Sequence, residues 1–207
     1  EDTGNARSDC IIIASINNDT KEVKLVSVYR DTLLNTEDDT YDKANSAYAV
    51  GGAEAAVNML NRNLDLDIQD YVSVNFLAVA DVVDLLGGID LDLTDEEVVH
   101  MNNYCVETSE ITGKKYKKIE PEVAGTYHLN GVQAVSYSRI RYTEGGDFQR
   151  TSRQRLVIEK IAEKAKKADL STINKIIDAV FPEITTSFTS GEIVKMSAGL
   201  LQYSIGD

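Results

Sequence analysis

Several residue types are scarce in this 207-residue chain, and each scarcity argues against a class of protein or a kind of site. Only two prolines interrupt a sequence that is 43% hydrophobic, which indicates a globular chain able to bury a substantial core. The two histidines and two cysteines form no Cys/His cluster, which argues against a structural zinc site. Cys10 and Cys105 do not decide the redox compartment. The apolar runs at Ile11–Ile16 and Phe76–Leu86 are too short, or too interrupted by aspartate, to span a bilayer.

Basic residues are scarce too: the chain has 21 lysines and arginines against 34 aspartates and glutamates, which gives a net charge of −13. Nucleic acid is therefore not an expected partner, because a phosphate polymer requires an extended basic surface. The arginines are nevertheless concentrated, and five of the eight lie between Arg139 and Arg155. Guanidinium groups bind phosphate oxygens two at a time, so this segment predicts a site for a small or terminal phosphate. The alternative is a solvated, basic start of a helix.

The spacing of these arginines supports a site. The pattern predicts a helix over Asp147–Lys167, preceded by a G-G-D turn. Its core-facing stripe is apolar in the later turns and polar in the first turns. Unpaired guanidinium is costly to bury, so the first turns must meet an anion or open into a cleft. The residues of this stripe are Arg150, Arg153, Gln154, Val157 and Ile161.

Strand and helix patterns interleave along the whole chain, which predicts an α/β fold. We expect one domain over residues 1–207, with three layers and helices on both faces of a mixed central sheet. The continuously apolar run from Cys10 is typical of a strand covered on both faces. Predicted strands are Cys10–Ile16, Glu22–Val28, Tyr71–Asn75, Ile89–Leu93 and Glu183–Ser187. A helix is predicted at Ala53–Asn63, after a break at Gly51-Gly52. The other predicted helices are Phe76–Leu86, Asn130–Ser138, Asp147–Lys167, Ile173–Val180 and Gly191–Gln202, with a helix and a loop or hairpin in Asp95–Val123.

A second polar cluster is expected near the start of the chain. Arg7 and Asp9 precede the first strand, and Arg30 and Asp31 follow the second. If these strands pair as a hairpin, the four side chains lie at one edge of the sheet, where a carboxylate could hold a divalent metal against phosphate. Surface ion pairs explain the same residues equally well. Lys43 and Asn45 add a positive charge and an amide near the start of the next helical segment.

Motifs in a fixed order now make the chain resemble a known family. In sequence they are R-S-D, Y-R-D, K-x-N-x-A-Y-x-x-G-G, V-N-F, D-x-L-G-G-I, H-L-N-G-x-x-A, R-x-R and G-D-x-x-R-x-x-R-Q. They run from Arg7 to about Ile161, and the chain is similar over this range to the LytR-CpsA-Psr family.

The resemblance implies an enzyme on the outer face of the cytoplasmic membrane, behind an N-terminal membrane anchor. Such enzymes bind a polyprenyl-pyrophosphate carrier and transfer its glycopolymer, such as teichoic acid or capsular polysaccharide, onto peptidoglycan. It also implies Mg²⁺, with Asp9 as a ligand. Matching catalytic positions are Arg7, Arg30, Asp31, Arg139, Arg141 and Arg150, and Lys43 and Gln154 join four of these arginines (Arg30, Arg139, Arg141 and Arg150) at the pyrophosphate. Asp31 and Asp147 match carboxylates expected to orient arginines.

One departure concerns the start of the chain. The family has a further strand ending in G-x-D upstream of R-S-D, so we expect this chain to be a fragment without the anchor and that first core strand. Two alternatives to transfer stay open: hydrolysis of the pyrophosphate at the same site, and binding of polyprenyl phosphate without chemistry.

Overall fold

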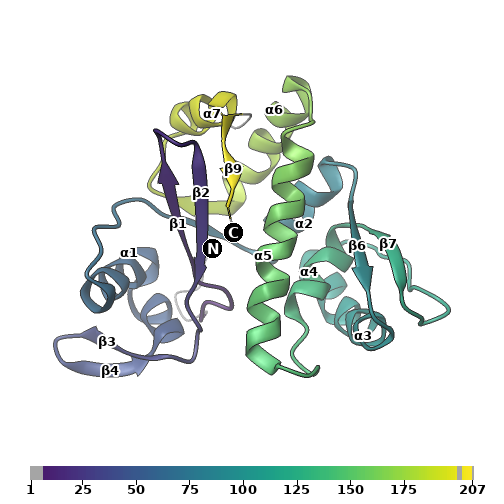
Figure 1. Cartoon of the computed structure of the whole chain (residues 1–207), viewed down its shortest axis with the longest axis horizontal. Coiled ribbons are helices and arrows are strands. Elements are labelled where there is room, and N and C mark those ends of the chain that lie inside the picture. Colours follow the sequence, from purple (N-terminus) through teal and green to yellow (C-terminus); the bar gives the residue numbers. More distant parts are fainter. Residues whose placement is uncertain (1–6, 200–201, 207) are drawn as a thin grey trace. The chain divides into compact units, whose positions relative to one another are not determined.

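Helices and strands alternate along the computed structural model (Figure 1), which describes residues 7–199 and 202–206. The predicted α/β class is confirmed, and the strands pair in both directions. Within the described residues they form a three-stranded sheet and three two-stranded sheets rather than one continuous sheet. The strands are two to six residues long, so each can support only a short ladder.

The chain divides into two compact units. Unit 1 holds the described residues of Glu1–Ser73, Thr185–Ile193 and Gln202–Asp207, and unit 2 holds those of Val74–Ile184 and Val194–Leu201. Within both, no helix combines the length and apolar composition needed to cross a membrane. Three elements run across the boundaries of these ranges: β5 (Val72–Val74), its partner strand β8 (Ile184–Thr186), and α7 (Ser190–Gly199).

Unit 1 is built on the predicted hairpin of β1 (Ile12–Asn17) and β2 (Glu22–Ser27), which pair antiparallel. The Asn17 side chain accepts hydrogen bonds from two backbone N–H groups of the turn, which fixes the reversal. A short strand, β9 (Ser204–Ile205), adds to β2 in parallel. The expectation that the first strand is covered on both faces is wrong. β1 is partly buried at its start, where Ile11 and Ile13 pack against the core of unit 1, and it is exposed from Ala14 on, beyond these core contacts.

Helix α1 (Ala44–Leu64) follows a hairpin of β3 (Leu33–Glu37) and β4 (Thr40–Lys43). The break predicted at Gly51-Gly52 is confirmed, because both glycines have non-helical backbone angles inside α1. Gly52 has φ = 66° and ψ = −156°, a combination that only glycine adopts without strain. The core of unit 1 joins α1 to the hairpin and contains Ala44, Ala47, Met59 and Leu60, packed against Ile11, Ile13, Val28, Leu34 and Ile68.

Unit 2 surrounds a two-stranded sheet of β6 (Ile89–Leu93) and β7 (Gly125–Leu129). The sequence I-D-L-D-L alternates strictly, so Ile89, Leu91 and Leu93 are buried while the aspartates point outward. Helices α2, α3, α4 and α5 supply the rest of this core. The helices of unit 2 are α2 (Phe76–Leu85), α3 (Asp95–Thr112), α4 (Gly131–Arg139), α5 (Gly146–Ala165) and α6 (Leu170–Val180), followed by a short 3₁₀ turn at Phe181–Glu183.

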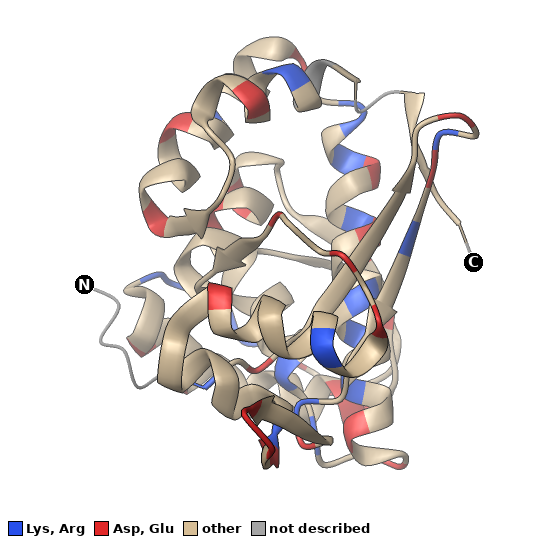
Figure 2. Ribbon diagram, turned by 90° about the vertical axis from the view of Figure 1, so that its left-hand side faces the viewer, with Lys and Arg blue, Asp and Glu red and all other residues tan. Residues whose placement is uncertain are grey.

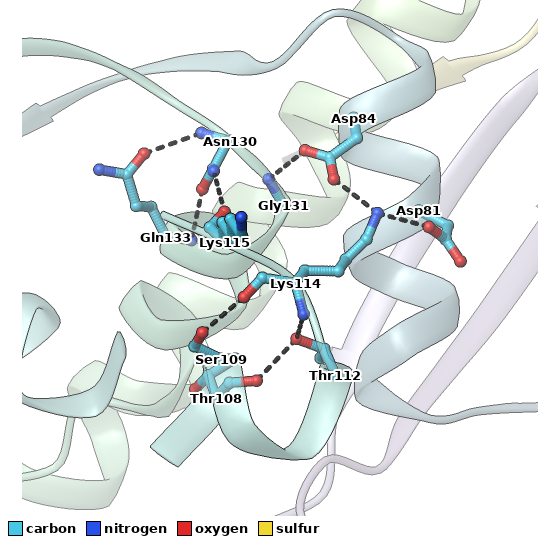
Figure 3. Close-up of polar contacts among 10 residues, drawn as sticks. All are labelled: Asp81, Asp84, Thr108, Ser109, Thr112, Lys114, Lys115, Asn130, Gly131 and Gln133. Atoms are coloured by element: carbon cyan, nitrogen blue, oxygen red, sulfur yellow. Dashed lines mark hydrogen bonds and ion pairs between the residues drawn. The ribbon is translucent and has the colours of Figure 1, made fainter. Parts of the chain in front are cut away.

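The start of α4 is locked to α2 by polar contacts. The Asp84 carboxylate accepts a hydrogen bond from the Gly131 backbone N–H (2.7 Å) and pairs with the Lys114 amine (2.7 Å), as Figure 3 shows. Lys114 also pairs with Asp81. Burial works to lower the pKa of Lys114, but the two carboxylates outweigh it and raise this pKa, so the amine stays charged. The network fixes the helix that ends at Arg139.

Gly131 is where α4 approaches α2 most tightly, and a methyl group there has no room. A Cβ at this position would lie 2.2 Å from the Ala80 carbonyl oxygen. We therefore expect Gly131→Ala to lower the free energy of unfolding by about 1–3 kcal/mol in urea titrations followed by circular dichroism. Gly191→Ala is the control, because the space around Gly191 in α7 is open. Equal stability of the two variants would contradict this packing argument.

Candidate functional site

The unit 1 cluster lies where β2 ends and α1 begins. Arg30 follows β2, and its guanidinium pairs with the Asp9 carboxylate and lies 3.6 Å from Asp31. The Arg30 carbonyl accepts a hydrogen bond from the Asn45 backbone N–H (3.0 Å), so the turn after β2 is tied to the start of α1. The Lys43 amine then reaches Asp31 at 2.7 Å. Four of the predicted site residues therefore lie together.

Asp31 is held between two cations, and this sets its acidity. A hydrogen bond from Lys43, aided by the charges of Lys43 and Arg30, lowers the pKa of Asp31. A carboxylate with a lowered pKa is a weaker base, so the geometry suits Asp31 to orienting Lys43 and Arg30. Arg7 is exposed nearby. The Lys43 backbone N–H chiefly lowers the pKa of Asp42, and the Arg7 charge contributes.

Asn45, the amide expected beside Lys43, belongs to this cluster and is buried. Its side chain is 1% exposed, yet neither its amide nitrogen nor its amide oxygen has a hydrogen-bond partner among the described residues. A buried amide without a partner costs free energy, so such groups call for an explanation in a bound ligand or water. In the sequence it stands in K-x-N, two residues after Lys43, the cation that Asp31 holds.

The unit 2 cluster is organised by Asp147, in the first turn of α5. Gly145 precedes this helix with φ = 89°, so the G-G-D turn has the backbone geometry that favours glycine. The Asp147 carboxylate lies 3.3 Å from the Arg150 guanidinium and 3.8 Å from that of Arg141. Arg150 is 3% exposed and Arg141 is 35% exposed in their side chains. One carboxylate thus holds two arginines of the predicted site, and Arg141 keeps the more open position.

Arg139, at the end of α4, lies against α3. Its guanidinium pairs with Glu107 at 2.8 Å and donates to the Thr108 hydroxyl at 2.9 Å. It also stacks over the Phe76 and Tyr104 rings, 4.8 and 5.4 Å from their centroids. Arg139 is fixed on two sides by these contacts, and its partner Glu107 is 60% exposed.

Arg153 shows where the reasoning from spacing was incomplete. Its stripe was expected to meet an anion or open into a cleft, and Arg153, which is 6% exposed, meets the Glu97 carboxylate at 2.8 Å. It also donates to the Ile140 carbonyl and the Thr143 hydroxyl. The anion is thus a carboxylate of the same unit, 56 residues away in sequence. Gln154, next along α5, is half-buried.

Figure 2 shows basic residues recurring along α5 among acidic ones, in keeping with its sequence. The predicted site residues fall into two groups, each described within its own unit. Unit 1 brings together Asp9, Arg30, Asp31 and Lys43, with Arg7 beside them. Unit 2 brings Arg141 and Arg150 together through Asp147, and holds Arg139 through Glu107.

The carboxylates of the two groups do not form a complete metal site by themselves. In residues 7–199 and 202–206, no group of three or more histidines, cysteines, aspartates or glutamates is arranged to hold one. Mg²⁺, however, is usually held in proteins through one or two carboxylates and the phosphates of a substrate. Asp9 is half exposed beside Arg30, so it fits as one such ligand rather than as part of a complete protein site.

Comparison with known proteins assigns the fold and these two groups to a class. The chain matches the LytR_cpsA_psr family over residues 1–205 and therefore belongs to it. It is 35% identical over 189 residues to biofilm regulatory protein A of Streptococcus mutans, covering 87% of this chain and 44% of that protein. It is 33% identical over 194 residues to the polyisoprenyl-teichoic acid–peptidoglycan teichoic acid transferase TagU of Enterococcus faecalis, covering 92% of this chain and 58% of that protein.

Solved structures agree with this membership. TagT bound to LI-WTA superimposes with a TM-score of 0.76 at 25% identity, covering 97% of this chain and 71% of that one. A Streptococcus agalactiae protein, gbs0355, gives a TM-score of 0.76 at 27% identity, covering 95% of this chain and 66% of that one. The chain spans about half the length of the curated relatives it matches.

The buried pair of Arg153 and Glu97 predicts a stability effect that separates structural from site arginines. Arg153→Met leaves the 14% exposed Glu97 without its cation, so we expect a loss of about 3 kcal/mol in the free energy of unfolding. Arg141→Met removes a longer, more exposed contact and should change stability by less than about 1 kcal/mol. Urea unfolding measures both, and a similar loss in the two variants would contradict the distinction.

Because the buried Asn45 amide has no partner among the described residues, replacing it should weaken pyrophosphate binding without lowering the stability of the fold. Asn45→Leu replaces it with an apolar group of similar size, so we expect unchanged or higher stability, by up to about 2 kcal/mol. Binding of inorganic pyrophosphate, measured by calorimetry, should weaken at the same time. Asn63→Leu is the control, because the Asn63 amide bonds the Asn35 and Met59 carbonyls and its loss should only destabilise. A strong loss of stability in Asn45→Leu would show that the Asn45 amide stabilises the fold, and would refute its assignment as a ligand-binding group.

Proposed function

We propose that this chain is the catalytic domain of a transferase that moves a glycopolymer from a polyprenyl-pyrophosphate carrier onto peptidoglycan. The observation that best supports this proposal is that Asp31 and Asp147, both in family motifs, each contact two cations of the predicted site. The carboxylates hold these cations in position before any ligand arrives. The function in the name of the E. faecalis relative supports the same reaction.

The reaction needs little covalent help from the protein. An acceptor hydroxyl of peptidoglycan attacks the phosphorus that carries the glycopolymer, and the P–O–P bond to the carrier breaks. The products are a phosphodiester between glycopolymer and peptidoglycan, and polyprenyl phosphate. Negative charge moves onto the leaving phosphate, so fixed guanidinium groups that contact it stabilise the transition state electrostatically. We propose this role for Arg30 in unit 1 and for Arg139, Arg141 and Arg150 in unit 2. Arg7 is proposed as a further catalytic residue, and Lys43 and Gln154 as pyrophosphate-binding residues of their respective units.

We propose Mg²⁺ as the cofactor, with Asp9 as one protein ligand. When bound, the ion would neutralise charge on the phosphate oxygens. The protein's own contribution is to position Asp9 through Arg30, which pairs with its carboxylate. We further propose that the protein acts on the outer face of the cytoplasmic membrane, held by an N-terminal anchor, because peptidoglycan lies on that side.

The proposed function is tested by removing one arginine that the fold does not depend on. Arg141→Ala should lower the transfer rate by at least about 100-fold, as loss of a transition-state contact does elsewhere, while the circular dichroism spectrum stays native. The assay combines the protein in its natural length, a lipid-pyrophosphate saccharide, Mg²⁺ and peptidoglycan. Arg62→Ala, on the exposed side of α1, is the matched control and should transfer normally.

The products of this assay distinguish the alternatives. Peptidoglycan-linked polymer supports transfer, and its loss on addition of EDTA supports the metal. Release of free phosphates without linkage would instead identify a pyrophosphatase. Intact lipid would identify a binding module without catalysis. Normal transfer by Arg141→Ala would remove the basis of the proposed mechanism.

A further inference from the structure

A cleft in unit 2 adjoins two arginines of the proposed pyrophosphate site, and the proposed function assigns no ligand to it. Its volume is about 490 Å³, within the range of small-molecule sites. One side is a stripe of α3, whose members lie three, four and seven residues from the first. The other side is the segment after Arg141. The lining residues are His100, Asn103, Tyr104, Glu107 and Tyr142.

The aromatic residues of the cleft are placed where a bound ligand can contact them. Tyr142 is 73% exposed, and its ring lies 6.3 Å from that of His100 with a tilt of 37°. Tyr104 is half-buried under the Arg139 guanidinium, which fixes its ring from behind. Burial raises the pKa of Tyr104, so its hydroxyl is protonated and can donate a hydrogen bond. The cleft thus offers ring faces with polar groups at their edges.

The polar residues of the cleft match a ligand with hydroxyl groups. The exposed Asn103 amide both donates and accepts. Glu107 accepts, and one of its oxygens is already anchored by Arg139 at 2.8 Å, so its position is set. No lysine or arginine is among the residues that line the cleft, which disfavours a phosphate. The mixture of polar groups also disfavours a lipid chain, because its polar atoms would lose water without replacement.

We propose that this cleft binds a pyranose sugar, with Tyr142 as the stacking platform. The C–H face of a pyranose carries weak positive charge and packs against the negative face of an aromatic ring. Asn103, Glu107 and the Tyr104 hydroxyl then bond the sugar hydroxyls. The inference rests on the proposed function for the sugar's origin: Tyr142 directly follows Arg141, and Glu107 holds Arg139, so the sugar binds next to the pyrophosphate.

Two sources can supply such a sugar, and binding measurements separate them. The probes are a polyprenyl-pyrophosphate saccharide, the same polyprenyl pyrophosphate without sugar, and a soluble, lipid-free peptidoglycan glycan. Tyr142→Ala should weaken binding of the sugar that occupies the cleft by about 3- to 10-fold, the worth of one aromatic contact. A loss confined to the lipid-linked saccharide identifies the donor glycan, and a loss confined to the soluble glycan identifies the acceptor.

Control variants keep the test specific. Tyr142→Phe retains the ring and should bind the sugar like the unaltered protein, and Asn103→Ala should weaken it. Tyr41→Ala removes a similarly exposed tyrosine, 61% exposed, from unit 1 and should change nothing. Unchanged affinity of Tyr142→Ala for both saccharides would overturn the proposal. An equal loss for the sugar-free lipid would overturn it too.

The two proposals can fail separately, because binding needs no turnover. Saccharide binding that depends on Tyr142 without any transfer product contradicts the proposed function and leaves the sugar site standing. Normal transfer by the unaltered protein, with Tyr142→Ala binding both saccharides normally, contradicts the sugar site and leaves the transferase standing.

Discussion

Repulsion between guanidinium groups is the constraint on which the site depends. Arginines gathered for a phosphate repel one another whenever no phosphate is bound, and burial strengthens this repulsion. The protein offsets it with carboxylates placed between cations: Asp147 contacts Arg141 and Arg150, and Asp31 contacts Arg30 and Lys43. Each carboxylate holds its cations in position, so a ligand does not have to order them. These ion pairs therefore position the cations of the site more than they stabilise the fold.

The parts of the fold that the sequence predicted are those determined by local chemistry. Strict alternation in Ile89–Leu93 gave β6 with its correct bounds, because every second side chain must face the core. The Gly51-Gly52 pair located the break in α1, since Gly52 needs a positive φ. Predicted and observed bounds of α2 differ by one residue. Such signals act within a few residues, and no distant partner is needed to interpret them.

The parts that were missed depend on partners far away in the chain or on weak turn signals. The β3–β4 hairpin turns through Asp38 and Asp39, both with positive φ, whereas glycine would have been the stronger signal. Strand β9 has only two residues and exists through its pairing with β2. Likewise, spacing on α5 marked Arg153 as needing an anion, but nothing local could show that Glu97 supplies it.

An acidic chain can still attract the polyanionic substrate that we propose, because charge acts over short distances in salt. At physiological ionic strength the screening length is about 8 Å, so a phosphate group at the surface senses mainly nearby charges and not the total of −13. The remaining surface, rich in aspartate and glutamate, repels other segments of an anionic polymer. Such a distribution favours engagement by one phosphate-bearing end over binding along the polymer. It also explains why a cleft lined by aromatic residues, without lysine or arginine, suits the proposed adjoining sugar: stacking adds affinity there without adding positive charge.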